Sequence, residues 1–167
     1  MLTRLSISNY ALIDNLTIDF HQKMNSITGE TGAGKSIMLG ALGLILGNRA
    51  DLSVLKDKSK KCVVEGNFEI GNYNLQPFFE ENDLDYDGIT IIRREITSSG
   101  KFRAFINDTP VNLKTMRELG LCLIDIHSQH QNLELETANF NLIWLILCLD
   151  QKKYYNNTVI CTMTLFR

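Results

Sequence analysis

A glycine-rich octapeptide near the N-terminus contains the side chains best suited to chemistry. Its residues, Gly29-Glu30-Thr31-Gly32-Ala33-Gly34-Lys35-Ser36, match the pattern G-x-x-x-x-G-K-[ST] of phosphate-binding loops. Glycines adopt backbone conformations that a Cβ would forbid, so the loop can turn its N–H groups inward around an anion. Lys35 can reach the β- and γ-phosphates of a nucleotide, and the Ser36 hydroxyl can ligate Mg²⁺. The alternative is an ordinary glycine-rich turn.

The segments on either side of the octapeptide have the patterns that such a loop requires. The preceding residues 24–28 end in a strand-like Ile-Thr. Residues 37–46 are apolar at helical spacing, and Gly47 is placed to end that helix. A helix starting near Lys35 would add the positive end of its dipole to the phosphate site.

The rest of the chain predicts a mixture of strands and short helices. Alternation predicts strands at 2–7, 16–20, 62–70, 89–96 and 102–106, with turns at 9–10 and 107–110, and the last two strands form a hairpin. Helices are predicted over 75–81, capped by Asn74, and over 113–119, capped by Asn112 and ended by Gly120. The run 121–126, apolar except for Asp125, predicts a strand buried on both faces.

The length and composition predict one globular domain, or one large piece of a domain. The chain has 167 residues, 44% of them hydrophobic, and a formal net charge of −2, so no global field attracts nucleic acid. Its cysteines are Cys62, Cys122, Cys148 and Cys161, with no C-x-x-C pair. Cys62 and Cys122 lie in apolar, strand-like runs that predict buried, reduced thiols, which fits the cytoplasm. The N-terminus lacks a signal-peptide pattern, and the apolar run 142–149 is too short to span a bilayer.

Basic residues gather at two places that could touch a nucleic acid. Residues 56–61 include four lysines, which suit either a solvated loop or a small phosphate-contacting patch. Lys101 and Arg103 lie in the predicted hairpin and allow the same two interpretations.

Several segments together resemble the RecN DNA-repair ATPases, which are relatives of the structural-maintenance-of-chromosomes (SMC) proteins. The resemblance covers roughly residues 1–141. Its segments are LSISNYALI at 5–13, ITGETGAGKS at 27–36, LGNRA at 46–50, IRREI at 92–96, RAFINDTPV at 103–111 and DIHSQHQ at 125–131. The loop alone is shared by many families, whereas its combination with Arg-Ala-Phe-Ile-Asn and Ile-His-Ser-Gln-His is far more specific.

The resemblance implies an α/β, P-loop NTPase fold, namely the N-terminal lobe of an ABC-type ATPase head with an N-terminal antiparallel β portion. It implies a C-terminal lobe, a second head forming a homodimer around two ATP molecules, DNA as a partner and no membrane. Gln129 falls at the family's glutamine loop, which senses Mg²⁺ and the γ-phosphate. Arg49 falls near an arginine that related heads place beside the nucleotide, although a surface role is equally compatible. His127 and His130 bracket Gln129 without a third metal ligand in sight, which favours ordinary loop histidines.

Motifs of a complete ATPase are missing from the sequence. Walker B needs four apolar residues followed by Asp-Glu, but Asp125 is followed by Ile126 and Asp150 by Gln151. The Leu-Ser-Gly-Gly signature and coiled-coil heptads are also absent. Residues 142–167 do not resemble the family. A truncated, frameshifted or deliberately cut product would explain this loss of resemblance. We therefore expect domain 1–141 to bind nucleotide with little or no turnover.

Two further hypotheses come from other classes of protein. A free-standing P-loop NTPase or small-molecule kinase would need its own lid arginines, for which Arg93-Arg94 are the candidates. Adjacent strand residues point to opposite faces, which suits a sheet better than a phosphate clamp. The remaining hypothesis is a structural fragment whose loop never holds nucleotide.

Overall fold

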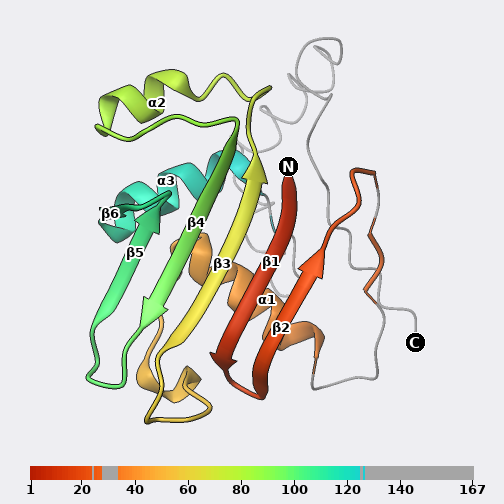
Figure 1. The fold of residues 1–167 in the computed structure, drawn as a ribbon, viewed down its shortest axis with the longest axis vertical. Helices are drawn as coiled ribbons and strands as arrows, with labels where there is room; N and C mark the ends of the chain where they lie inside the picture. Colours follow the sequence, from red (N-terminus) through yellow and green to blue (C-terminus); the bar gives the residue numbers. More distant parts are fainter. Residues whose placement is uncertain (24, 28–33, 125, 127–167) are drawn as a thin grey trace, which may run out of the picture.

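A computed structural model of the chain describes residues 1–23, 25–27, 34–124 and 126 (Figure 1). Residues 29–33 of the octapeptide lie outside this part, as do Asp125, His127, Gln129, His130 and the segment 142–167. The roles predicted for those residues therefore stay predictions.

The described residues form one six-stranded sheet in the order β2-β1-β3-β4-β5-β6, with every neighbouring pair antiparallel. This arrangement confirms the predicted antiparallel β portion. The β4–β5 hairpin is also confirmed, with Gly100 in its turn at a φ of +78°. The strands are β1 Leu2–Tyr10, β2 Ile13–Asp19, β3 Cys62–Glu69, β4 Ile89–Ile96, β5 Phe102–Ile106 and β6 Thr109–Val111.

Two longer helices cover one face of this sheet. Figure 1 shows α1 (Lys35–Ile45) and α3 (Leu113–Leu123) on the same side, while the short α2 (Gln76–Glu81) lies beyond the ends of β3 and β4. A 3₁₀ turn, η1, spans Leu52–Val54. Alternate side chains of β3 and β4 are buried toward α1, so the core lies between the helices and the sheet.

The end of α1 follows the sequence prediction. Gly47 has a φ of +86°, and its N–H donates to the carbonyl of Leu44 over 3.2 Å. The next N–H, of Asn48, donates to the carbonyl of Gly43 over 2.8 Å. These two bonds are the Schellman pattern, in which a left-handed glycine satisfies the last helical carbonyls.

The predicted end of α3 at Gly120 is wrong. The helix continues through Gly120 to Leu123. A Cβ at Gly120 would lie 3.0 Å from the Cα of Leu46, so this glycine serves the close approach of α3 to the end of α1. Contact between two helices, rather than a cap, explains the residue type.

The predicted buried strand 121–126 is also wrong over its described residues. Leu121 to Leu123 form the last turn of α3, and the Leu121 side chain is 73% exposed. Met116, Leu119 and Leu123 are buried at spacings of three and four residues, which is the period of a helix. An apolar run of this length suits a strand or a buried helix, and packing against α1 decides between them.

Three smaller predictions also differ from the structure. Residues 25–27 belong to no strand. Asn9 and Tyr10 end β1 instead of forming a turn. The N-cap of α2 is Leu75 and not Asn74, whose φ of +51° places it in the preceding turn. The cap of α3 is confirmed, because Asn112 accepts a hydrogen bond of 2.9 Å from the N–H of Thr115.

We predict that Gly47→Ala destabilises the protein by at least about 2 kcal/mol, from left-handed strain and overpacking together. A Cβ at this position would lie 2.7 Å from the Cβ and 2.8 Å from the Cα of Arg117. Denaturant unfolding of both proteins measures the difference. The matched control is Gly71→Ala, where a Cβ meets nothing within 4 Å. Equal unfolding midpoints for the two variants would contradict this account of the junction between α1 and α3.

Candidate nucleotide-binding site

The last three residues of the octapeptide form the start of α1. Gly34 is the N-cap, and Lys35 and Ser36 are the first two helical residues. The first helical hydrogen bond runs from the N–H of Met38 to the carbonyl of Gly34 over 3.1 Å. This start confirms the predicted change from loop to helix, and it places Lys35 and Ser36 at the positive end of the helix dipole.

The N-terminus of α1 has the electrostatics of an anion site. Gly34 provides no capping side chain, and the first turn contains no acidic residue. Ser36 is exposed, and a Cβ at Gly34 would meet nothing within 4 Å, so the backbone here can be approached closely. First-turn N–H groups, a lysine and an exposed hydroxyl fit the phosphates of a nucleotide and a hydrated Mg²⁺ ion.

The position of this N-terminus depends on how α1 is seated on the sheet. Met38, Leu42 and Ile45 are buried in the core. A Cβ at Gly66 of β3 would lie 2.6 Å from Cδ1 of Ile45, so the missing side chain admits the helix. The two ends of α1 are thus fixed by its buried face and by the Gly47 turn.

Tyr10 makes a second close approach to α1, from the end of β1. A Cβ at Gly40 would lie 2.6 Å from the hydroxyl oxygen of Tyr10. The ring of Tyr10 is buried, and burial raises the pKa of its hydroxyl. The tyrosine therefore stays neutral and acts as a packing group beneath the helix.

Arg49 lies apart from the start of α1. It is exposed and follows the C-terminal end of the helix, about 16 Å of helix away from Lys35 at 1.5 Å per residue. The helix thus places Arg49 at the end opposite to Lys35 and Ser36, the described end of the octapeptide. A nucleotide contact by Arg49 stays a prediction.

The basic segment 56–61 is held against the end of β1 by Asn9. The amide nitrogen of Asn9 donates to the carbonyls of Asp57 and Lys60 over 2.9 and 3.0 Å. Its amide oxygen accepts from the N–H of Asp57 over 2.7 Å. Sequence reasoning missed this role, and the only signal was a polar residue at the end of an alternating strand.

Most lysines of this segment have carboxylate partners. Lys56 pairs with Asp14 at 2.5 Å, and Lys61 pairs with Glu95 at 3.2 Å. Lys60 lies 3.6 Å from the carboxylate of Asp57. The structure therefore favours the solvated loop over a patch of unneutralised charge. Lys101 and Arg103 are both exposed near the β4–β5 turn.

The candidate lid arginines lie on opposite faces of β4. Arg93 is on the face without helices, with Glu95 at 3.7 Å and the ring centroid of Phe105 at 4.7 Å. Arg94 is on the helix-covered face and is buried. Two side chains on opposite sides of a sheet cannot close on one phosphate, so the lid interpretation loses its support.

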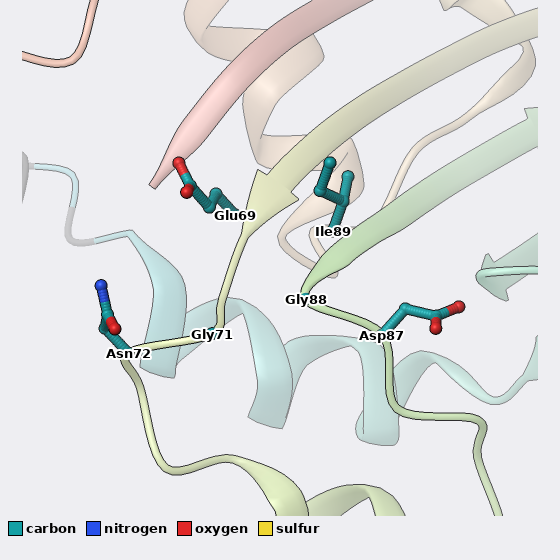
Figure 2. A pocket seen from close by; sticks show the side chains of 6 residues that line it. All are labelled: Glu69, Gly71, Asn72, Asp87, Gly88 and Ile89. Carbon is teal, nitrogen blue, oxygen red and sulfur yellow. The ribbon is translucent and has the colours of Figure 1, made fainter.

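A cavity of about 580 Å³ lies where β3 leads toward α2 and where β4 begins (Figure 2). Glu69 and Asp87 line it, but Figure 2 shows their carboxylates directed away from each other. Lys35 and Ser36 do not line it. Among the described residues, no three His, Cys, Asp or Glu side chains are grouped closely enough to hold a metal ion.

The two described cysteines differ in exposure. Cys62 is fully buried, as predicted, and burial raises the pKa of its thiol to about 11. Cys122 is exposed on α3, so its predicted burial is wrong. Neither forms a disulfide. None of the helices in the described ranges is long and apolar enough to cross a membrane.

Comparisons with known proteins place this geometry among ATPase heads. A family model described as "AAA domain" matches residues 4–154. The chain is 41% identical over 146 residues to "DNA repair protein RecN" of Vibrio cholerae, covering 87% of this chain and 26% of that protein. It is 39% identical over 134 residues to the RecN of Bacillus subtilis, covering 79% of this chain and 23% of that one. The chain therefore spans about a quarter of the length of these curated relatives.

Solved structures of more distant proteins share the fold. One comes from work on "ATP-driven dimerization and DNA stimulated activation of SMC ATPases", with a TM-score of 0.63, 16% identity, and coverage of 87% of this chain and 96% of that one. Another is the recombination mediator RecF with ATP, with a TM-score of 0.57, 16% identity, and coverage of 90% and 39%. At this identity the likeness concerns the fold alone.

We predict that Asn9→Ala lowers the free energy of unfolding by about 2–3 kcal/mol, because it removes hydrogen bonds to three partly buried backbone groups. Asn9 also has a φ of +53°, which costs alanine a further strain. Chemical denaturation measures the change. Asn9→Gly separates the two effects, since glycine removes the hydrogen bonds without the strain. Full stability of Asn9→Gly would show that the amide does not hold the 56–61 loop.

Thiol alkylation should distinguish the two described cysteines. At pH 8, iodoacetamide should modify Cys122 in the folded protein and leave Cys62 unmodified, because Cys62 is inaccessible and protonated. Peptide mapping by mass spectrometry measures both sites. In denaturant, both should react, which serves as the control. Modification of folded protein at equal rates would contradict the described burial.

The same burial gives a pH dependence of stability. The pKa of Cys62 is raised from an ordinary 9.0 to about 11, so the unfolded chain loses this proton first. The contribution of the protonated Cys62 thiol to the free energy of unfolding is therefore fully present below about pH 9, and it is lost as the pH rises toward about 11. Unfolding of a Cys62→Ala variant should show a shallower loss of stability across that interval. An identical slope would exclude ionisation of Cys62 as its cause.

Proposed function

The chain belongs to the RecN family of SMC-like, AAA-domain ATPase heads as an N-terminal lobe, and from this premise we propose that it binds ATP with Mg²⁺ at the start of α1. One observation carries the proposal. The helix that follows the G-x-x-x-x-G-K-S motif begins at Lys35, with no capping side chain and no acid in its first turn. An N-terminus of this kind can donate the N–H groups of its first turn to phosphate oxygens.

Each residue of the motif has a distinct task in this proposal. The backbone from Gly29 to Gly34 surrounds the phosphates, and Lys35 neutralises charge on the β- and γ-phosphates. The Ser36 hydroxyl orients toward Mg²⁺, which when bound would neutralise charge that develops on the phosphates during cleavage. Gln129 would accept a hydrogen bond from the attacking water, because an amide can do so without adding charge.

We propose further that this lobe has little or no turnover by itself. No Asp-Glu pair follows an apolar run in the sequence, and there is no Leu-Ser-Gly-Gly segment. The water-activating carboxylate and the contacts across the nucleotide stabilise the transition state rather than the bound ground state. Their loss should therefore reduce catalysis far more than binding. We also propose that the ATP-binding lobe ends near residue 141 and that residues 142–167 are not part of it.

The biological setting is proposed from the relatives. RecN proteins are named for DNA repair, and the SMC study is named for ATP-driven dimerization and DNA-stimulated activation. We propose that this lobe acts with a C-terminal lobe and a second copy of the head in the repair of broken DNA. A cytoplasmic location at the bacterial nucleoid follows from that role.

ATP with Mg²⁺ should raise the melting temperature of the wild-type chain, because a ligand that binds only the folded state stabilises it. Lys35→Ala should weaken ATP binding about ten- to hundredfold, as expected for losing a charge-assisted contact. Thermal shift and calorimetric titration measure binding, and phosphate release measures turnover. Turnover should be near background in both proteins.

Lys101→Ala is the matched control, since it removes one exposed lysine far along the chain from the motif. It should bind ATP like the wild type. Equal losses in both variants would indicate a general charge effect rather than a site at Lys35. A robust, Lys35-dependent hydrolysis by this chain would overturn the half-site proposal and favour a free-standing enzyme.

A further inference from the structure

A second cavity, of about 470 Å³, lies at the sheet edge where β6 leads into α3. Arg94 of β4, Phe102 and Arg103 of β5, and Asn112 and Leu113 at the start of α3 contribute to its lining. Lys35 and Ser36 do not line it. The cavity is therefore formed by a different set of elements from the nucleotide site at α1.

Arg94 is unusual among the charged residues of this fold. It is only 5% exposed, and its buried Nε, like that of Arg93, makes no hydrogen bond. Its neighbour Arg93 has the carboxylates of Glu65 and Glu95 within 4.0 Å. Within the part of the chain that the structure describes, Arg94 has no such ion pair, and burial alone lowers its pKa.

A buried guanidinium without a counter-charge is costly. Arginine stays protonated at physiological pH, so the cost cannot be relieved by losing the proton. Charged groups that remain buried in folded proteins are normally paired. The lining of the cavity includes no carboxylate that could balance Arg94, whereas Arg103 pairs in register with Glu95 on the opposite face of the sheet. Arg94 thus marks a place that an anion would stabilise.

The start of α3 adds to the positive potential of the cavity. This helix has 11 residues and no acid in its first turn. Asn112 caps it by accepting from the N–H of Thr115, which satisfies one of the first-turn donors. The dipole of the helix therefore presents its positive end where Asn112 and Leu113 line the cavity.

The remaining lining suits an aromatic group beside the anion. Phe102 is 41% exposed, although large apolar side chains are usually covered. Ala104 pairs with Arg94 and Phe102 pairs with Ile96, so Phe102 lies diagonally across the ladder from Arg94 on the same face. The volume of about 470 Å³ exceeds what a lone phosphate needs.

We propose that this cavity binds the phosphate of a nucleotide unit, with the base stacked on Phe102. Arg94 provides a planar fork for two phosphate oxygens, and the α3 N-terminus provides the dipole. Stacking on an aromatic ring accepts any base, so the nucleotide can be free or part of a single strand. This site is independent of the ATP site at α1, because no residue from 34–36 lines it.

Calorimetric titration and thermal shift with three probes test the proposal: inorganic phosphate, AMP without Mg²⁺, and a short single-stranded oligodeoxythymidylate. Arg94→Met should weaken the binding of all three about tenfold or more, since a charge-assisted contact is lost. Phe102→Ala should weaken AMP and the oligonucleotide but leave inorganic phosphate unchanged. If the oligonucleotide binds more tightly than AMP, the source of the phosphate is a single strand. If AMP binds more tightly, the source is a free nucleotide.

Two controls keep the result interpretable. In phosphate-free buffer, Arg94→Met should be at least as stable as the wild type, because it removes an unpaired buried charge and keeps similar volume. Lys35→Ala should retain AMP binding, which separates this cavity from the α1 site. Binding that depends on Lys35 and not on Arg94 would overturn the proposal. So would an Arg94→Met variant that binds every probe like the wild type.

Discussion

The close seating of α1 on the sheet is the constraint on which the rest of the structure depends. The helix approaches β3 where Gly66 leaves room for Ile45, and it passes over Tyr10 where Gly40 leaves room for the hydroxyl. Its far end is fixed by the Gly47 turn against Arg117 of α3. With these contacts made, the first turn of the helix has one position relative to the sheet. A phosphate-binding loop needs that rigidity, because its donors act only at a defined distance from the phosphate oxygens.

The sequence predicted those features whose cause is local. The start of α1 follows from the glycine-lysine-serine motif, and its end follows from a glycine placed after an apolar helix. The same logic failed at Gly120, because a glycine near the end of a helix has two explanations. One is a left-handed cap, as at Gly47, and the other is close approach of a second backbone, as Leu46 makes to Gly120. Only the tertiary contact distinguishes them, and that contact joins residues more than seventy positions apart.

Side-chain roles in the candidate sites follow the same division. Lys35 and Ser36 were predictable because a short motif fixes both their chemistry and their place on the helix. Asn9 was not, since its partners lie 48 and 51 residues away in a loop without regular structure. The alternation of side chains along β4 correctly predicted that Arg93 and Arg94 lie on opposite faces of the sheet. It also places Glu95 on the same face as Arg93, but it could not indicate the second carboxylate, Glu65, which the register of the ladder brings from the neighbouring strand.

The start of α1 and the start of α3 reach a similar electrostatic arrangement by different routes. At α1, the lysine belongs to the helix itself and the N-cap is a glycine, so one continuous segment encodes the site. At α3, the cap is an asparagine and the nearby cation is Arg94, which comes from a strand paired with β5. The first arrangement is recognisable as a motif, whereas the second exists only after the sheet has formed. A chain with a net charge of −2 can thus present local positive potential at helix starts, because position rather than total charge determines what an anion meets.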